Sequence, residues 1–439
     1  RQMCIRDSGI LLGVNEIKVS DAPKGTVLVA RELTPSVTAG IVKENIAGII
    51  TETGGTTSHS AILARALEIP AVLSVEGVAS SLKNGDTVVV DGSEGAVIVN
   101  PDDNTVAEYS KKRDAFLAER KELENYRGRE TKSASGEAYE LFCNIGKPED
   151  AVKAVDADGE GVGLFRTEFL FMDRTSIPTE DEQFEAYKKA ALILKGKSLI
   201  IRTLDIGGDK DIPYLGLEKE ENPFMGFRAI RYCLKNRELF KSQIKAILRA
   251  SAFGDIKIMF PLITTMDELR EGKKLVAECK ADLRNMGINF NENIQVGVMV
   301  ETASAAVIAD MLAKEADFFS IGTNDLTGYT MACDRGNNDV SYLYSPLQPS
   351  VLRMIKRTIE CGVQNGISVG MCGEAAANKL MIPLLISFGL TEFSVSAPSV
   401  LNVRKIISTW TKEEADKVTA KVLEMSTQQE IVEYLKSVV

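Results

Sequence analysis

The sequence predicts an α/β protein in which a small mixed α/β domain is followed by a C-terminal (β/α)8 TIM barrel. Two observations lead to this fold class. Eight short apolar runs recur from residue 137 onward with helix-like segments between them, and Val- and Ile-rich runs broken by Gly, Asp and Pro precede residue 102. The length of 439 residues fits two domains, because one such barrel takes about 250 residues.

The small N-terminal domain is predicted over residues 9–101. We expect its strands at the runs GTVLVA, IAGIITE, AVLSVEG, DTVVVDG and GAVIVN, and its helix at SHSAILARAL, where Pro70 follows the helix end. The opening residues 1–8, RQMCIRDS, follow no pattern that predicts structure. We therefore treat them as a candidate non-native scar and leave them out of the domain.

Residues 102–132 have a strongly charged composition, which includes the run SKKRDAFLAERKELENYRGRETK. The apolar positions that fall roughly on one helical face are Val106, Tyr109, Phe116, Leu117 and Leu123. We predict a solvated linker helix, because a charge run with one apolar stripe is usually of that kind. An interaction coiled coil is the alternative.

The barrel is predicted over residues 133–439. We expect its eight strands at AYELFCNI, GVGLFRTE, SLIIRTLDI, IKIMFPLI, IQVGVMVE, FFSIGTND, ISVGMCGE and EFSVSA, and two of its helices at EQFEAYKKAALIL and DELREGKKLVAECKADLRN. Seven of these strand runs end in, or are followed by, Arg, Glu, Asp, Asn, Cys or Gly. Since the C-terminal strand ends form the active face of such a barrel, reactive groups there indicate a site.

The overall composition argues against several classes of function. With 52 Lys+Arg against 62 Asp+Glu, the net charge of −10 argues against binding to nucleic acid or to an anionic membrane. The seven cysteines form no CxxC pair and the chain has one histidine, which argues against structural zinc and suits a reducing cytosol. We find no run of 18 apolar residues and no typical signal peptide, so we expect a cytoplasmic protein without membrane insertion.

Four arginines are expected at the mouth of the barrel. Arg166 follows the second strand, Arg202 lies near the end of the third, Arg335 lies in the loop after the sixth, and Arg228 lies in NPFMGFRAIR. Each arginine alone is more typical of a structural salt bridge. Together they match a ligand with a phosphate and a carboxylate, because the guanidinium group binds both bidentately and stays charged.

Two acidic residues are expected next to each other on the same rim. Glu301 ends the fifth strand and Asp325 ends the sixth. Two carboxylates, substrate oxygens and waters make an octahedral site of the kind that Mg²⁺ prefers. Alternatively, the two acids cap helices or neutralise the arginines. Asn324 either orients a substrate oxygen or makes a turn.

The chain also offers a candidate proton donor and a candidate nucleophile. Cys372, in GMCGEAA at the end of the seventh strand, either donates a proton to a substrate carbon or packs as a small hydrophobic residue. His59 follows GGTTS at an expected helix N-terminus, where free N–H groups and the helix dipole would hold a phosphoryl group. A lone histidine is more often structural. Beside a barrel built for phosphate and Mg²⁺, we favour a histidine that carries phosphate covalently.

These motifs also resemble a known family. GGTTSHSAILARALEIPAV resembles the phosphohistidine-domain signature, and GVGLFRTEFLFM, RTLDIGGDK, NPFMGFRAIR, GTNDLTGYTMACDRGN and GMCGE resemble the barrel of enzymes that use phosphoenolpyruvate (PEP). The similarity covers residues 9–439, and DIGGDK and DLTGYTMACDRGN are closest to the Enzyme I branch, the phosphoenolpyruvate-protein phosphotransferases of the bacterial sugar phosphotransferase system. The resemblance implies that PEP phosphorylates a histidine with release of pyruvate, and that the phosphoryl group passes to the carrier protein HPr for sugar uptake.

The resemblance also implies a role for each site residue. By position, His59 would be phosphorylated, Arg166, Arg202, Arg228 and Arg335 would bind PEP with Asn324 and Lys210 assisting, Glu301 and Asp325 would ligate Mg²⁺, and Cys372 would protonate the enolpyruvate. It implies a phosphohistidine domain over residues 9–101 that swivels about the linker helix. It also implies a homodimer through the barrel.

The sequence departs from the family pattern in two places. The helical domain that binds HPr in the family has no counterpart here, so we expect an N-terminally truncated enzyme without the family's docking domain for HPr. ETASAA after Glu301 has no proline where the family pattern has one. A fragment of PEP synthase or pyruvate phosphate dikinase, which share the same two domains, is one alternative. A regulatory or scaffolding protein that only binds PEP is another, and the presence of His59 and Cys372 disfavours it.

Overall fold

The structure of the protein is a computed structural model. It describes residues 2–5, 19–33, 41–54, 64, 67, 69–172, 174–207, 212–334 and 337–439. The chain divides into two compact units, Arg1–Glu122 and Leu123–Val439. Within the described ranges, every helix is too short or too polar to cross a membrane.

The first unit is built on a parallel sheet. Its strands run in the order β1 (Gln2–Ile5), β2 (Thr26–Ala30), β3 (Ile46–Thr51) and β4 (Ala71–Val72), beside the short helices η2 (Val19–Asp21) and α3 (Val78–Ser81). An antiparallel pair, β5 (Val88–Asp91) and β6 (Ala96–Val99), completes the described strands of this unit. Four of the five predicted strand runs hold a strand of four to six residues.

Three features of this unit differ from the expectations or fall outside the described residues. The run AVLSVEG holds only the two-residue β4, because Ser74 has φ 59 and cannot continue an extended strand. The strand β1 lies within the opening residues that we left out, and it pairs in parallel with β2. The predicted helix SHSAILARAL lies mostly outside the described residues, although Ala64 and Leu67 are helical.

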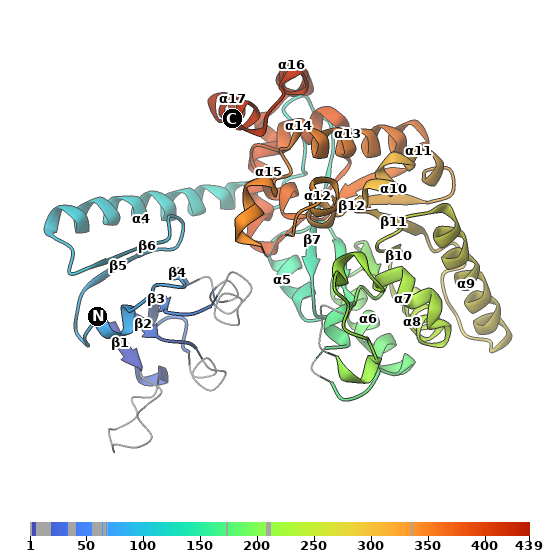
Figure 1. The fold of residues 1–439 in the computed structure, drawn as a ribbon, viewed down its shortest axis with the longest axis horizontal. Coiled ribbons are helices and arrows are strands. Elements are labelled where there is room, and N and C mark those ends of the chain that lie inside the picture. The colour runs from blue at the N-terminus through green and yellow to red at the C-terminus, as the bar shows by residue number, and fades with distance from the viewer. Residues whose placement is uncertain are drawn as a thin grey trace. The chain divides into compact units, whose positions relative to one another are not determined.

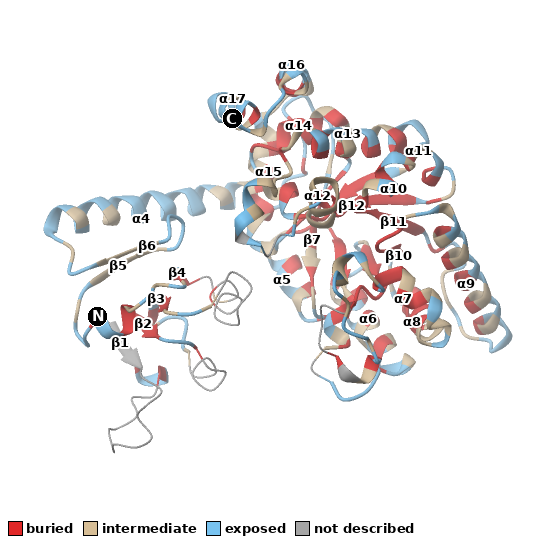
Figure 2. Cartoon of the chain, in the orientation of Figure 1, coloured by how far each residue is buried: buried red, intermediate tan, exposed pale blue. Residues whose placement is uncertain are grey.

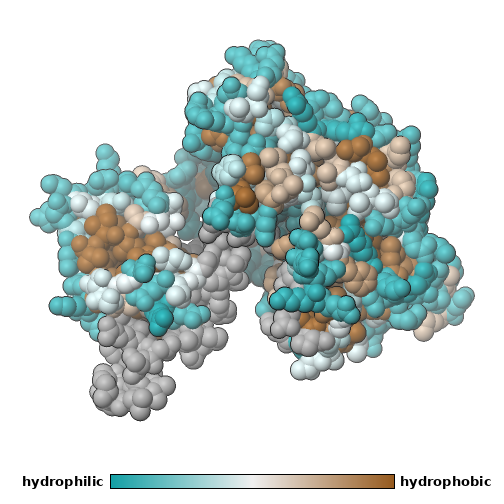
Figure 3. Space-filling model, in the orientation of Figure 1, coloured by the Kyte–Doolittle hydropathy of each residue, from teal (hydrophilic) through white to brown (hydrophobic). Residues whose placement is uncertain are grey.

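The described residues of the first unit form two small hydrophobic clusters. One lies around Leu28 and Ile49, and the other around Val29 and Ile50, so each face of the sheet is covered separately. The side chains of β5 and β6 are only partly buried, and Figure 3 shows hydrophobic residues on the visible surface of this unit.

A long helix, α4 (Asp103–Leu123), follows the small sheets and continues into the 3-10 turn η3 (Glu124–Tyr126). None of the residues of α4 is buried, and Phe116 and Leu117 are exposed. The helix predicted within residues 102–132 is therefore present but shorter, and Gly128 at φ 72 follows its end. Its role as a linker stays a prediction.

The second unit contains the predicted barrel. Its eight parallel strands are β7 (Glu140–Ile145), β8 (Val162–Arg166), β9 (Leu199–Arg202), β10 (Ile256–Phe260), β11 (Val296–Val300), β12 (Phe318–Ile321), β13 (Ser368–Met371) and β14 (Glu392–Val395), and β14 pairs with β7 to close the ring. Each predicted run holds one strand, and most strand residues are buried (Figure 2). The predicted fold class is confirmed.

Helices surround the strands (Figure 1). They are α5 (Asp150–Asp156), α6 (Glu180–Leu194), α7 (Ala229–Lys235), α8 (Arg237–Ala250), α9 (Met266–Asn285), α10 (Ala303–Val307), α11 (Ala309–Leu312), α12 (Thr323–Met331), α13 (Pro349–Gln364), α14 (Ile382–Phe388), α15 (Val400–Thr409), α16 (Lys412–Glu424) and α17 (Gln428–Val438). The two helices predicted explicitly are α6 and α9, and each begins at a capping box, formed by Thr179 and by Thr265.

Strand alternation decides which side chains point into the barrel. On β9, Leu199 and Ile201 belong to the cluster between strands and helices, whereas Ile200 belongs to the small interior cluster. Because side chains alternate along a strand, Arg202 lies on the same face as Ile200. The same alternation relates Glu301 to the interior residue Met299. The C-terminal end of the barrel therefore receives charged groups directly above an apolar interior.

Candidate active site

Arg202, the last residue of β9, is held by two acidic side chains. Its guanidinium group lies 2.9 Å from Glu168 Oε1 and 2.9 Å from Asp205 Oδ2, and all three residues are buried. Its backbone oxygen accepts a 2.8 Å hydrogen bond from the hydroxyl of Thr167. A buried ion pair of this kind fixes the direction of the guanidinium group, because neither partner can turn away without losing its counter-charge.

Arg228 contacts the other carboxylate oxygen of Asp205. Its Nη2 lies 2.7 Å from Asp205 Oδ1 and 3.1 Å from Asp325 Oδ2, and its Nη1 donates to the hydroxyl of Tyr329 at 3.3 Å. Asp205 therefore bridges Arg202 and Arg228. Arg228 is the N-cap of α7, and Ala229, the first residue of that helix, has a strained φ of 53°.

Three carboxylates meet at the strand ends. Asp205, Glu301 and Asp325 each offer an oxygen, and these oxygens lie within 4.8 Å of one another. Leu262, at φ 53 after β10, donates its backbone N–H to Glu301 Oε1 at 2.6 Å. Burial, together with the nearby charges of Asp325 and Asp205, raises the pKa of Glu301 to about 8. The three carboxylates repel one another, and a metal ion that prefers oxygen ligands would offset their negative charges.

Cys372 follows β13 and closes the small interior cluster beneath these charges. Its backbone N–H donates to Ile321 O at 3.1 Å, and Asn144 Nδ2 donates to its carbonyl oxygen at 3.4 Å. Burial raises the pKa of the thiol to about 11, so the sulfur carries a proton at neutral pH. A protonated thiol at this position can act as a general acid.

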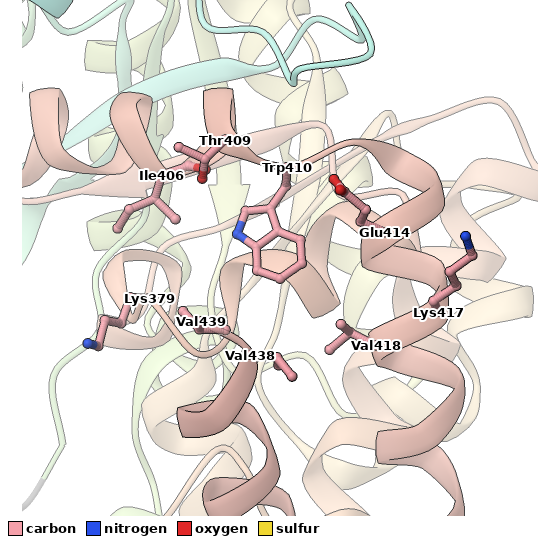
Figure 4. A pocket seen from close by; sticks show the side chains of 9 residues that line it. All are labelled: Lys379, Ile406, Thr409, Trp410, Glu414, Lys417, Val418, Val438 and Val439. Carbon is pink, nitrogen blue, oxygen red and sulfur yellow. The ribbon is translucent and has the colours of Figure 1, made fainter.

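A pocket opens beside these groups. It is lined by Phe224 and Met225 from the loop before α7, and by Asn324, Asp325 and Tyr329 from α12. A second hollow lies around Trp410, between α15, α16 and the C-terminal residues (Figure 4). In that hollow the ammonium groups of Lys379 and Lys417 point to opposite sides, so it gathers no set of convergent polar groups.

The structure brings together six of the predicted site residues and leaves three outside its description. Arg202, Arg228, Glu301, Asp325, Asn324 and Cys372 lie at the C-terminal ends of β9, β11, β12 and β13 or in the segments that follow them. Arg166 ends β8, and its charge acts on the pKa of the Cys372 thiol. His59, Lys210 and Arg335 lie outside the described residues.

The sequence analysis missed Asp205, the acid that joins both arginines to the carboxylate cluster. A signal was present, since Asp205 lies in the motif RTLDIGGDK, three residues after Arg202 at a strand end. Glu168, Tyr329 and Asn144 were missed as well. Glu168 follows β8, Asn144 is next to the last residue of β7, and Tyr329 lies in α12. Residue type alone did not distinguish them from ordinary rim residues.

Comparison with known proteins agrees with this geometry. The family described as PEP-utilising enzyme, PEP-binding domain, matches residues 120–411, and the PEP-utilising enzyme, mobile domain, matches residues 22–95. The phosphoenolpyruvate-protein phosphotransferase of Bacillus subtilis (strain 168) is 50% identical over 99% of this chain and 76% of the relative. The chain belongs to the phosphoenolpyruvate-protein phosphotransferase family of PEP-utilising enzymes.

Further relatives of this PEP-utilising enzyme carry the same name. The phosphoenolpyruvate-protein phosphotransferase of Staphylococcus carnosus (strain TM300) is 47% identical over 97% of this chain and 74% of the relative. An NMR solution structure of Enzyme I shares 50% identity, covers 23% of this chain and 41% of that chain, and has a TM-score of 0.22, which is too low to bear on the fold. The resemblance stated from the sequence motifs is confirmed.

Proposed function

We propose that this PEP-utilising enzyme transfers the phosphoryl group of PEP to His59, releases pyruvate, and then passes the phosphoryl group to the carrier protein HPr. One observation carries the proposal most directly. Two buried arginines, Arg202 and Arg228, meet three carboxylates at the same end of the barrel where the protonated thiol of Cys372 lies. PEP needs this combination, because it carries a phosphate, a carboxylate and a carbon that must be protonated.

The arginines would bind the two anionic groups of PEP. Arg202 and Arg228 are already oriented by Asp205, so their donors are in place before the ligand arrives. Arg166 lies at the neighbouring strand end. From the sequence motifs, Arg335, Lys210 and Asn324 complete the binding set in this proposal.

The carboxylates would hold Mg²⁺. Glu301 and Asp325 are the predicted ligands, and Asp205 joins them because its oxygen lies in the same cluster. Their hard oxygens suit Mg²⁺, and their crowding disfavours three free negative charges. When bound, Mg²⁺ supplies positive charge that offsets the charge on the transferring phosphoryl group.

The covalent step would need only a positioned nucleophile and an acid. The imidazole of His59 attacks phosphorus, the bond from phosphorus to the enol oxygen breaks, and enolpyruvate is formed. The Cys372 S–H bond then breaks and its proton goes to C3 of the enolpyruvate, which gives pyruvate. The raised pKa keeps the Cys372 thiol protonated until that step.

The organisation of the chain follows from the same proposal. We assign residues 9–101 to the phosphohistidine domain, 102–132 to the linker helix and 133–439 to the PEP-binding barrel. Residues 1–8 were set aside as a candidate scar, but the pairing of β1 with β2 favours including them in the first domain. The protein would be a cytoplasmic homodimer that associates through its barrel. The alternative, a fragment of PEP synthase or pyruvate phosphate dikinase, is favoured by no observation in the structure.

Labelling with PEP tests the proposal. The chain is incubated with PEP labelled in its phosphate and with Mg²⁺, in the absence of ATP, next to His59→Ala. We expect acid-labile, base-stable label on the parent chain and none on the variant. An unlabelled, folded parent chain would contradict the proposal, and label that requires ATP would favour the dikinase or synthase alternative.

A further inference from the structure

Gln243 is a buried polar residue on α8, a helix of the barrel unit. It is fully buried, and among the described residues that α8 buries it is the only polar one. The others are Phe240, Ile244, Ala246, Ile247, Leu248 and Ala250. A polar side chain on an apolar helix face carries a desolvation cost unless it is hydrogen-bonded, so its partners indicate its role.

The amide group of Gln243 is bonded through both its oxygen and its nitrogen. Its Oε1 accepts from the backbone N–H of Leu204 at 2.9 Å, and its Nε2 donates to the hydroxyl groups of Thr167 and Tyr187, each at 3.2 Å. Because the N–H of Leu204 can only donate, the amide oxygen must face it, and this fixes the direction of both amide hydrogens. A buried amide bonded in this way is rigid, since any turn would leave its partners unsatisfied.

Gln243 holds two segments that follow neighbouring strands of the barrel. Thr167 comes directly after β8, and Leu204 comes two residues after the end of β9. These segments, with the strand ends before them, carry four charged residues of the candidate site. They are Arg166 and Glu168 on the first segment and Arg202 and Asp205 on the second. Each of these charges therefore lies within two residues of a hydrogen bond from Gln243.

The hydrogen bonds of Gln243 begin where the described pairing of the two strands ends. The register of β8 and β9 ends with Arg166 opposite Arg202. Beyond this pair, the hydroxyl group of Thr167 donates to Arg202 O at 2.8 Å, and Gln243 donates to that same hydroxyl group. Side-chain hydrogen bonds thus continue the link between the two strand ends at the level of the guanidinium groups.

A second set of hydrogen bonds fixes Gln243 from the side of α6, which packs against α8. The hydroxyl group of Tyr187 accepts from Gln243 and donates to Gln183 Oε1 at 3.2 Å, and Gln183 Nε2 donates to Pro178 O at 3.1 Å. Gln183 is also buried, but its described hydrogen bonds go to Tyr187 and Pro178 rather than to either strand-end segment. It therefore offers a matched control for Gln243.

We propose that Gln243 is a positioning residue for PEP binding, because it fixes the spacing of the two strand-end segments that carry Arg166 and Arg202. This inference rests on the proposed function. The hydrogen bonds of Gln243 reach backbone and hydroxyl groups, so it acts through the arginines rather than on PEP itself. Guanidinium groups that are already spaced for a phosphate and a carboxylate need less ordering when the ligand binds. Loss of Gln243 should therefore weaken PEP binding rather than the transfer step.

Phosphorylation of the full chain over a range of PEP concentrations tests this role. The chain is mixed with Mg²⁺ and excess PEP labelled in its phosphate, without an acceptor protein, and the rate of the first turnover is measured. The PEP concentration that gives half the maximal rate reports binding, and the maximal rate reports transfer from bound PEP. Gln243→Met keeps the length of the side chain and removes its amide group. Each variant is measured at a temperature where it is folded.

We expect the half-maximal PEP concentration to rise by about tenfold in Gln243→Met and by about threefold in Thr167→Val, with the maximal rate kept. Thr167→Ser keeps the hydroxyl group and should match the parent chain. Gln183→Met, the matched control, should lose stability without a change in the half-maximal concentration. Thr167→Val decides the question if Gln243→Met does not fold.

The outcomes separate this role from the proposed function. An unchanged half-maximal concentration in folded Gln243→Met or in Thr167→Val overturns the inference and leaves the proposed function intact. An equal rise in Gln183→Met overturns it as well, because it would show a general effect of lost stability. Absence of phosphorylation in the parent chain overturns both.

Discussion

In the barrel, one hydrophobic cluster extends from Leu141 to Leu435, and three buried arginines next to it, Arg202, Arg228 and Arg404, are paired with acidic side chains. The described part of residues 1–122 has two small clusters around Ile49 and Ile50 and the partly buried strands β5 and β6. It also has most of α4, which buries no residue. A larger unit buries a larger fraction of its surface, so it can carry the free-energy cost of buried charges more easily.

The comparison indicates that the larger core of the barrel is what allows charged side chains to be buried and held in fixed directions. Arg202 and Arg228 keep their directions because Asp205 and the surrounding core leave them no alternative partner in water. Preorganised charges of this kind favour a transition state without further rearrangement. The family match of residues 22–95 to a mobile domain agrees with a smaller N-terminal unit that carries little buried charge among its described residues.

Arg202→Met should have the largest effect on the barrel, on both its stability and its chemistry. The change leaves Glu168 and Asp205 buried without their counter-charge, so we expect the free energy of unfolding to fall by roughly 3–5 kcal/mol. We also expect phosphorylation from PEP to fall by about a hundredfold or more. Urea unfolding followed by fluorescence measures the first effect, because the single tryptophan, Trp410, lies in the barrel unit. Arg202→Lys, which keeps the charge, should lose less stability, and equal stability of Arg202→Met and the parent would contradict the account.

Arg404→Met should separate stability from chemistry within the barrel unit. Arg404 is fully buried and bonds to Asp158, Glu160, the Thr131 hydroxyl and Tyr126 O, none of which belongs to the candidate site. We expect a loss of about 3 kcal/mol in the free energy of unfolding. At a temperature where the variant is folded, its rate of phosphorylation from PEP should match that of the parent. A reduced rate in the folded variant would show that these ion pairs influence the site.

The buried side chain of Glu392 should make the free energy of unfolding depend on pH. The pKa of Glu392 is raised in the folded state, so its contribution is fully present below the unfolded pKa and is lost as the pH rises through about 8. Relative to Glu392→Gln, the parent should lose about 2–3 kcal/mol between about pH 6 and pH 8. Urea unfolding of both proteins at the two pH values measures this difference. Parallel stability curves would mean that Glu392 is ionised in the folded protein.

The smallest effect on the free energy of unfolding is expected for a substitution on α4. Leu117 is 53% exposed, so Leu117→Gln should change the free energy of unfolding by less than about 0.5 kcal/mol. Urea unfolding at two protein concentrations provides the measurement. A larger loss that depends on concentration would support the coiled-coil alternative for the apolar stripe of this helix.

Strand positions were predictable because the barrel strands are short and largely apolar, and seven of the eight runs end in, or are followed by, Arg, Glu, Asp, Asn, Cys or Gly. All eight runs hold strands, and the reactive residues at their ends could be assigned to one face by the geometry of the barrel. The run AVLSVEG was misleading, since its apolar pattern gives no sign of the positive φ at Ser74. The apolar pattern of a run therefore predicts a strand even where the backbone conformation of one residue ends it.

The contacts within the site were less predictable. Asp205 is close to Arg202 in sequence, but its proximity to Glu301 and Asp325 depends on three different strand ends. Asn144 bonds to Ser394 and to Cys372, residues far along the chain that only closure of the barrel brings together. The roles of His59, Lys210 and Arg335 stay predictions from their motifs.

The most direct test of the central claim counts products in one turnover. Excess PEP and Mg²⁺ are mixed with the chain without any acceptor protein, and pyruvate and acid-labile phosphate on the chain are measured in the same quenched samples. The account predicts a burst in which the two appear in equal amounts, about one per chain, and none in His59→Ala. Pyruvate that continues to form without phosphate on the chain, or a burst that survives in His59→Ala, would contradict it.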